Sequence, residues 1–295
     1  MNDAYSPLFL AASGGDLETI LELSPAAGQQ DLNRSLAQAA ALSHFEAAEA
    51  LLQAGAEADG DYDPLYGTVL FPACEYMNPE GIEWLIGQGA DPAREVLRVE
   101  GRRNALQHLL HSHHRSPLKG RCIQLLIQGG APDPADALMA IHRGSLSQLQ
   151  KLLDAAPELL GQSLEVSYGH FPLEGASLLH MAVEFNQREM VEELLSRGLE
   201  VNHRAETIPG TVNTTPVWPT DLVALGGQTP LFHAKGFSKD LMKLLLDHGA
   251  DPSLEASFLR DGKEISLTPL EFFEEIDRIE CNLLEEVLTL KTAKR

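Results

Sequence analysis

Four histidines crowd a short stretch of the chain, and imidazole groups at that density can bind a metal ion. They are His108, His111, His113 and His114, within "HLLHSHHRSPLKG" at 108–120. Zinc and nickel accept neutral imidazole, but protein sites commonly add Cys or carboxylate ligands, and none is interleaved here. The last three histidines are expected in a loop, and His108 on a helix face toward a neighbour. We therefore expect no bound metal, with metal binding by this cluster as the open alternative.

Two His–acid pairs have a spacing compatible with acid–base chemistry. His180 and Glu184 in "HMAVE" are four residues apart, so a helix would place them on one face. Asp247 and His248 are adjacent, at the end of an apolar run. The chain contains no G-x-S-x-G, P-loop, G-x-G-x-x-G or H-E-x-x-H motif. We expect no catalytic residue and no cofactor, and an enzyme site assembled only in space remains the alternative.

The charge of the chain narrows the class of partner. Its 295 residues include 22 basic and 43 acidic side chains, for a net charge of −21. A field of that sign repels nucleic acid and anionic membrane surfaces and favours a cationic partner. Solubility alone is the simpler explanation of the same charge.

The cysteines and the apolar runs indicate the cellular compartment of the protein. Cys74, Cys122 and Cys281 lie far apart and form no C-x-x-C pair, which argues against a disulfide framework or a zinc site. The N-terminus has no basic region before its short apolar run, and 18 consecutive apolar residues occur nowhere. We expect a cytoplasmic protein that does not contact membranes.

One structural unit recurs along the chain and must position any functional residue. In "SLLHMAVEFNQREMVEELLSRGLEVN", 177–202, Leu179, Met181, Ala182 and Val183 indicate a first short helix. A second apolar stripe follows at Met190, Val191, Leu194 and Leu195, and Gly198 can then close the helix in the left-handed conformation. Helices this short must bury their stripes against neighbouring copies.

The spacing of the closing glycines supports a repeat array with insertions. Gly55 to Gly89 is 34 residues, Gly89 to Gly130 is 41, and Gly198 to Gly249 is 51. A period near 33 residues is typical of several helical repeat families.

These segments resemble the ankyrin repeat, which reads T-P-L-H-x-A-A, G-H and V-V-x-L-L-L-x-x-G-A-D-x-N. The match is good in "TPLFHAKGFSKDLMKLLLDHGADPS" at 229–253, with Phe232 at the family's His position, and in "SPLFLAASGGDLETIL" at 6–21. His180 keeps the family's His, so the resemblance gives it a structural role. The resemblance implies an all-α fold class, an ankyrin-repeat solenoid of paired short helices with projecting β-turn or hairpin loops.

We expect one ankyrin-repeat domain over 1–295, with about seven repeats and a capping end. The expected repeats are 5–33, 34–67, 68–103, 104–135, 136–174, 175–226 with an insertion at 203–226, and 227–265, followed by a C-terminal cap at 266–295.

The insertions between repeats hold the candidate partner-binding residues. The largest, around "TIPGTVNTTPVWPTD", contains three prolines that exclude a long helix, and its β-branched residues favour a hairpin finger. In "LEASFLRDGKEISL", 254–267, Asp261-Gly262 predicts a two-residue hairpin turn. Aromatic and acidic side chains on such loops suit a basic protein surface. The candidates are Asp61, Tyr62, Asp63, Tyr66, Tyr168, His170, Phe171, Trp218 and Asp221. Turn chemistry, solubility, or packing of Trp218 onto the core are the alternatives.

The resemblance and the charge together predict a non-catalytic protein-binding module, monomeric on its own. It would engage a protein, expected to be basic, through its concave face and extended loops, with no nucleic acid and no membrane among its partners. The most specific hypothesis is a bacterial immunity or antitoxin protein that neutralises a toxin, for example a nuclease. A general adaptor or chaperone-like scaffold for another cellular protein is the alternative.

Overall fold

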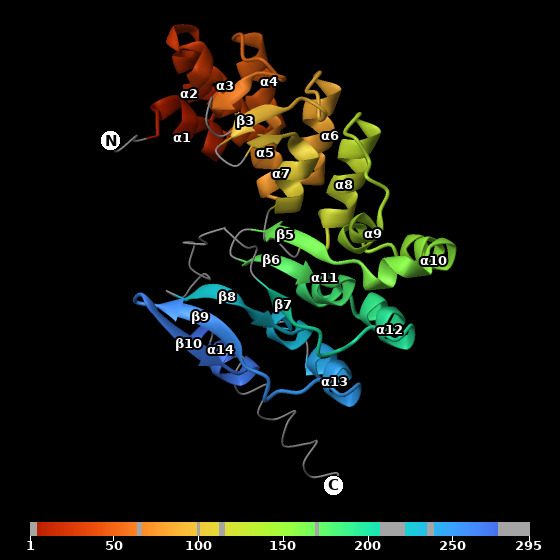
Figure 1. The fold of residues 1–295 in the computed structure, drawn as a ribbon. Coiled ribbons are helices and arrows are strands. Elements are labelled where there is room, and N and C mark those ends of the chain that lie inside the picture. Colours follow the sequence, from red (N-terminus) through yellow and green to blue (C-terminus); the bar gives the residue numbers. More distant parts are fainter. Residues whose placement is uncertain are drawn as a thin grey trace. The chain divides into compact units, whose positions relative to one another are not determined.

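The computed structural model describes residues 5–63, 67–98, 101–111, 116–168, 171–206, 222–234 and 239–276. The chain forms two compact units, residues 1–134 and 135–295 (Figure 1). The boundary between them lies within one residue of the expected end of the fourth repeat. No helix in the described ranges is long and apolar enough to cross a membrane.

The first unit consists of helix pairs joined by short turns. Its helices are α1 (Pro7–Gly14), α2 (Leu17–Leu23), α3 (Gln29–Ala41), α4 (Phe45–Gln53), α5 (Leu70–Glu75), α6 (Pro79–Gly87), α7 (Ala105–His111) and α8 (Lys119–Gln128), with a 3-10 turn η1 (Ser24–Ala26). The first helices of successive pairs, α1, α3, α5 and α7, each contact the next one along the chain. Helix α3 begins at Gln29, five residues before the start that the sequence predicted for the second repeat.

Two small hairpins project from the first unit. Strand β1 (Asp61–Asp63) pairs with β2 (Gly67–Thr68), and β3 (Val96–Arg98) pairs with β4 (Gly101–Arg103), both antiparallel. Each follows the second helix of a pair and leads into the first helix of the next. They therefore stand where the sequence placed the loops between repeats.

The second unit combines helix pairs with a six-stranded antiparallel sheet. Its helices are α9 (Ala137–Arg143), α10 (Leu146–Ala155), η2 (Pro157–Gly161), α11 (Leu178–Glu184), α12 (Arg188–Ser196), η3 (Pro230–His233), α13 (Lys239–Asp247) and α14 (Pro269–Ile276). Its strands are β5 (Leu164–Tyr168), β6 (Phe171–Ala176), β7 (Ala205–Glu206), β8 (Val223–Gln228), β9 (Ala256–Arg260) and β10 (Lys263–Leu267), in the order β10-β9-β8-β7-β6-β5. Consecutive inter-repeat loops have thus joined into one sheet. Figure 1 shows β8–β10 on the left of this unit and α12 and α13 on its right.

The helix ends confirm the role predicted for the recurring glycines. Gly55, Gly89, Gly130, Gly198 and Gly249 all have positive φ, between 90° and 116°. In each case the next residue donates its backbone N–H to a carbonyl five positions earlier, as Ala250 does to Leu245 at 2.9 Å. This closure turns the chain away from the helix axis and into the following hairpin.

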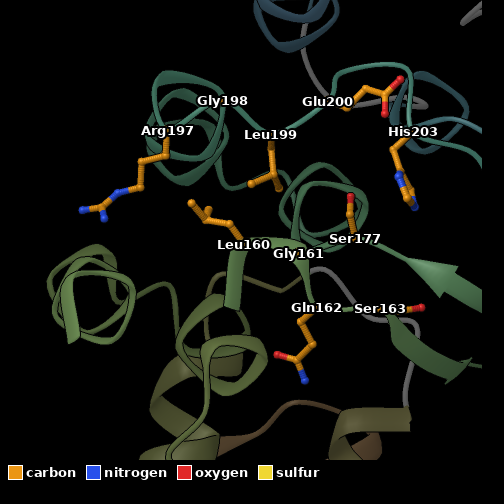
Figure 2. A pocket seen from close by; sticks show the side chains of 10 residues that line it. All are labelled: Leu160, Gly161, Gln162, Ser163, Ser177, Arg197, Gly198, Leu199, Glu200 and His203. Atoms are coloured by element: carbon orange, nitrogen blue, oxygen red, sulfur yellow. The ribbon is translucent and has the colours of Figure 1, made fainter. Parts of the chain in front are cut away.

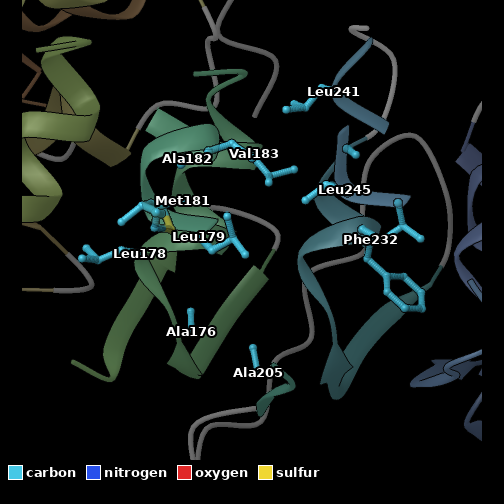
Figure 3. Close-up of a cluster of buried hydrophobic side chains, with 14 of the residues drawn as sticks. Ala176, Leu178, Leu179, Met181, Ala182, Val183, Ala205, Phe232, Leu241 and Leu245 are labelled. Carbon is cyan, nitrogen blue, oxygen red and sulfur yellow. The ribbon is translucent and has the colours of Figure 1, made fainter. Parts of the chain in front are cut away.

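The core of the second unit lies between successive helix pairs and under the sheet. Figure 3 shows Leu179 and Val183 of α11 on the side that faces Phe232, Leu241 and Leu245. The four residues predicted to line the first helix of the 177–202 repeat are all buried. In its second helix Leu194 is buried completely, whereas Leu195 only packs against the edge of the core. The predicted helix phase is therefore confirmed, with Leu195 at its margin.

Candidate partner-binding surfaces

The β1–β2 hairpin carries three of the predicted partner-binding residues. Asp61 pairs with Thr68 across the hairpin, and Asn33 of α3 donates its side-chain amide to the Asp61 carbonyl at 3.2 Å. The Asp61 side chain is exposed, and that of Tyr62 is partly buried. Asp63 ends the strand, and its side chain is outside the described part of the chain. The hairpin is thus tied to the helix layer beneath it through Asn33.

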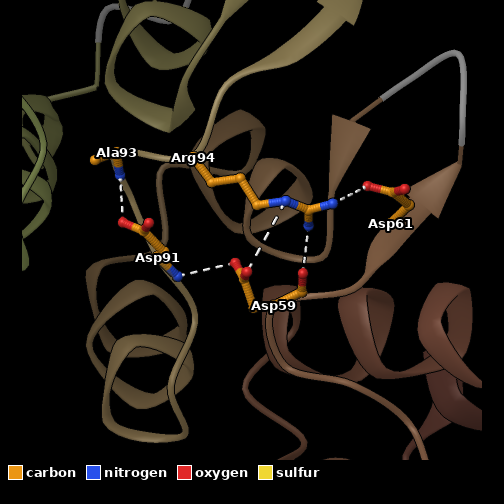
Figure 4. Close-up of polar contacts among 5 residues, drawn as sticks. All are labelled: Asp59, Asp61, Asp91, Ala93 and Arg94. Atoms are coloured by element: carbon orange, nitrogen blue, oxygen red, sulfur yellow. Dashed lines mark hydrogen bonds and ion pairs between the residues drawn. The ribbon is translucent and has the colours of Figure 1, made fainter.

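Arg94, from the next inter-repeat loop, also contacts this hairpin (Figure 4). Its Nη2 lies 2.7 Å from Asp61 Oδ1, and its Nη1 donates to the backbone carbonyl of Asp59. Asp59 in turn accepts the backbone N–H of Asp91 at 3.0 Å. At least one carboxylate of the hairpin, that of Asp61, is therefore already paired with a cation of the same chain. No signal in the sequence predicted this contact, because Arg94 lies in a different loop.

Tyr62 turns toward the helix layer. The guanidinium carbon of Arg34 lies 5.8 Å from the centroid of the Tyr62 ring, a cation–π distance. Burial raises the pKa of the Tyr62 hydroxyl, and Arg34 partly opposes that rise. Tyr62 is therefore held in place before any partner arrives, and its role in binding stays a prediction.

For two further candidates, in the hairpins of the second unit, the structure describes the backbone and not the side chain. Tyr168 and Phe171 pair with each other at the tip of β5–β6, and their side chains are outside the described part. The predicted turn at Asp261-Gly262 is confirmed, with φ of 50° and 72° between β9 and β10. Tyr66, His170, Trp218 and Asp221 lie outside the described residues. The two ends of the large insertion are joined, because Ala205 of β7 pairs with Gln228 of β8.

The histidine-rich stretch begins on α7. His108 lies on this helix as expected, whereas His111, expected in a loop, is its last residue. His108 is buried, stacks on Phe71 with ring centroids 4.3 Å apart, and places Nε2 2.9 Å from Glu75 Oε1. Its neighbours His113 and His114 and the His111 side chain are outside the described part. Among the described residues no group of three or more His, Cys, Asp or Glu side chains could hold a metal ion.

Ser177 and His180 form a serine–histidine pair that invites a catalytic interpretation. Ser177 Oγ lies 2.9 Å from His180 Nδ1, the distance expected between a nucleophile and its base. The same Nδ1, however, accepts the backbone N–H of Ser177 at 3.1 Å, and Nε2 donates to the carbonyl of Gln228 at 3.1 Å. Both imidazole nitrogens are thus committed to the backbone, as a capping box of α11 and a tether to β8. The structural role expected for His180 agrees with this geometry.

The surroundings of His180 keep it neutral. Complete burial lowers its pKa well below the ordinary 6.5, and the neighbouring His233 and His203 lower it further. His233 Nδ1 binds Glu184 Oε2 at 2.9 Å, so Glu184 pairs with the next repeat and not with His180. His203 Nε2 binds the carbonyl of Gly175 at 2.8 Å. The other predicted His–acid pair, Asp247-His248, is exposed, and His248 binds the carbonyl of Leu244 at 2.8 Å.

A hollow of about 320 Å³ opens beside this network, between η2 and the loop after α12 (Figure 2). Leu160 and Leu199 face one another across it, and Ser177 and His203 lie on one side. Arg197, at its rim, is committed to Asp154 and Glu193, at 2.7 and 2.6 Å. The polar side chains Ser177, His203 and Arg197 of this hollow are therefore bonded to other parts of the repeats.

Comparison with known proteins identifies two segments of the second unit. Residues 174–203 and 226–256 each match a family model described as the ankyrin repeat. The first segment spans α11 and α12, and the second runs from β8 through η3 and α13. No curated protein matches the chain.

Two solved structures align with nearly all of the chain. The human ASB11 ankyrin repeat domain is 21% identical, with 97% of each chain covered and a TM-score of 0.36. The ankyrin repeat domain of Bcl-3, described as a unique member of the IkappaB protein family, is 23% identical, with 96% of this chain and 100% of that chain covered and a TM-score of 0.32.

Proposed function

We propose that this chain, which is an ankyrin-repeat protein, is a non-catalytic module that binds a basic protein. Ankyrin repeats are generally protein–protein interaction modules, and the chain has their paired helices and inter-repeat hairpins. The observation that carries the choice of partner is the charge, −21 over the whole chain. An acidic field accelerates encounters with a cationic surface and disfavours an anionic one.

The hairpin sheet of the second unit supports this proposal in detail. Its exposed acids include Glu255, Asp261 and Glu264. Two arginines of the same strands and loops are engaged within the chain. Arg204 donates to the carbonyl of Glu255 at 2.6 Å, and Arg260 pairs with Glu275 at 2.5 Å. The six strands and the β9–β10 turn contain five acidic side chains and two basic ones, so their net charge is negative, which suits a basic partner surface. The acids are Glu165, Glu174, Glu206, Asp261 and Glu264, and the bases are Arg260 and Lys263.

The most specific form of the proposal is a cytoplasmic bacterial immunity or antitoxin protein. A toxin that cleaves nucleic acid must attract phosphate, so its active site is basic, and an acidic array can cover it. An adaptor or chaperone-like scaffold for a different basic client is the alternative. The two differ in what loss of the chain does to the host cell.

Affinity purification from the native host tests the binding proposal. The immobilised chain is expected to retain a basic protein at about 50 mM salt and to release it by about 500 mM, because screening weakens exposed charge pairs. A partner retained equally at both salt concentrations would contradict electrostatic recognition.

A genetic test separates the two forms of the proposal. Deletion of the gene is expected to arrest growth only while the captured partner is present, and co-expression of the two is expected to restore growth. A partner that is harmless when expressed alone would remove the immunity form and leave the adaptor form.

A further inference from the structure

A separate hollow in the first unit is lined by a cation that stands alone in an acidic stretch of the sequence. It measures about 360 Å³ and lies where the start of α1 meets the start of α3. Its walls include Tyr5, Ser6 and Phe9 from the first repeat and Asp31 and Arg34 from α3. Binding of a small molecule in this hollow can be measured without any protein partner and is independent of the proposed function.

Arg34 is an exceptional cation. It is the only Lys or Arg among the first 93 residues, which contain 15 Asp and Glu. Although acids surround it in the sequence, Arg34 forms no ion pair within the described ranges of the chain. Its Nε is buried and has no hydrogen-bond partner there. A buried guanidinium donor without an acceptor is costly, so an incoming acceptor would be bound favourably.

The guanidinium is already oriented. The Tyr62 ring lies 5.8 Å from its central carbon, and α3 carries it at a fixed place in the wall of the hollow. A guanidinium held in this way offers parallel N–H donors, the arrangement that a carboxylate accepts best.

An aromatic surface stands beside this donor. Tyr5 stacks on Phe9, with ring centroids 4.6 Å apart and planes 12° from parallel. Phe9 is buried, whereas Tyr5 is 60% exposed. A flat ring or apolar group next to a bound carboxylate would gain contact with the Tyr5–Phe9 stack.

Asp31 limits what the hollow can accept. Its Oδ1 accepts the Ser6 hydroxyl at 2.5 Å, which fixes the carboxylate on the wall near Arg34. A ligand with several negative charges would be repelled by Asp31. The hollow therefore favours a ligand with one carboxylate over a ligand with several negative charges.

We propose that this hollow binds a carboxylate attached close to an aromatic or apolar group, with Arg34 as its anchor and the Tyr5–Phe9 stack as its platform. Such a group occurs in a free aromatic acid and at the end of a polypeptide whose last residue is apolar. The chemistry is the same in both, and the two sources are separated by the probes.

The test is a titration of the ¹⁵N-labelled full chain followed by NMR, with N-acetylphenylalanine as the probe. Its primary amide is the matched control, since it keeps the ring and removes only the charge. We expect saturable shifts at Arg34 Nε and at the amides of α1 and α3, with a Kd in the millimolar range for a ligand of this size. The amide is expected to bind at least about tenfold more weakly, as loss of one charged hydrogen-bond pair predicts. Equal shifts from both probes, or no shift from either, would overturn the proposal.

Variants of the protein give a second readout. Arg34→Gln is expected to weaken the acid about tenfold and to leave the amide unchanged, whereas Asp31→Asn is expected to tighten the acid by removing a like charge. Arg188→Gln, at an exposed site in the other unit, is the control. If Arg34→Gln perturbs the fold, the tighter binding of the acid expected in Asp31→Asn still tests whether the hollow binds a carboxylate. Unchanged affinity in Asp31→Asn together with an equal effect of Arg34→Gln on both probes would refute a carboxylate site.

A peptide ending in phenylalanine, acetyl-Gly-Gly-Gly-Phe, distinguishes the two sources. Tighter binding of the peptide than of N-acetylphenylalanine supports a polypeptide end as occupant, and tighter binding of the small acid supports a free acid.

Discussion

Acid is expected to destabilise the second unit through His180. The imidazole is fully buried, its Nδ1 accepts the Ser177 N–H at 3.1 Å, and its Nε2 donates to Gln228. A proton added at Nδ1 would face an N–H donor and would charge a group without water contact. His203 and His233, with ring centroids 5.8 and 5.5 Å from that of His180, add to the penalty when they are charged.

The direction of the pKa shift sets the sign of the effect. The pKa of His180 is depressed in the folded chain, so between the folded and unfolded pKa values the unfolded state binds more protons. Its contribution to stability is therefore complete above the unfolded value of 6.5 and is lost as the pH falls below it. The slope is at most about 1.4 kcal/mol per pH unit, so the loss from about pH 7 to about pH 5.5 is about 1 kcal/mol.

Urea unfolding at the two pH values measures this loss, and a variant isolates it from other titrating groups. His180→Asn keeps a polar side chain at the helix start and cannot titrate in this range. We expect the decrease in unfolding free energy to be about 1 kcal/mol smaller in His180→Asn than in the wild type, and unchanged in His248→Gln, which alters an exposed histidine. An identical decrease in all three proteins would refute the buried neutral state of His180.

Three further substitutions test the frame of the array. Leu245→Ala removes a side chain with 0% exposure and should lower the free energy of unfolding by about 2–5 kcal/mol, measured by urea denaturation, and a loss below about 0.5 kcal/mol would contradict its burial. Gly249→Ala places a Cβ at φ 91° with no atom within 4 Å of it, so the backbone conformation alone should lower the free energy of unfolding by about 1–2 kcal/mol. Its control, Gly87→Ala at the end of α6, should leave the free energy of unfolding unchanged or raise it, and equal effects of the two substitutions would contradict the left-handed closure. Arg94→Gln should lower the free energy of unfolding by about 1–2 kcal/mol, because it removes one partly exposed ion pair and a charged hydrogen bond to Asp59. It should also speed amide hydrogen exchange in β1 and β2, and unchanged exchange there would show that Arg94 does not hold the hairpin.

The repeat frame was predictable because its signals are local. Apolar stripes three and four residues apart set the buried faces, and Gly198 and Gly249 marked the helix ends in the sequence alone. A local dipeptide, Asp261-Gly262, likewise predicted the turn between β9 and β10. The start of α3 at Gln29 was missed because the residues before it form a 3-10 turn and not a long loop.

Contacts between loops were not predictable in the same way. The six-stranded sheet depends on pairing between loops tens of residues apart, as between Ala224 of β8 and Phe258 of β9. The ion pair of Arg94 with Asp61 also joins two different loops, and neither residue type reveals its partner. The position of Arg34 as the one cation in an acidic segment was readable from the sequence, but only the structure shows its unpaired Nε and the stacked rings beside it.

Recognition of a basic partner through the hairpin sheet is tested most directly by two variants with equal changes of charge. The hairpin variant combines Glu255→Gln, Asp261→Asn and Glu264→Gln, and the helix variant combines Glu189→Gln, Asp240→Asn and Asp247→Asn on α12 and α13. The measurement is the Kd for the captured partner as a function of salt, by titration calorimetry. We predict that the hairpin variant binds at least about tenfold more weakly at low salt and loses part of its salt dependence, while the helix variant stays within about threefold of the wild type. Equal weakening by both variants, or none by the hairpin variant, would contradict this mode of recognition.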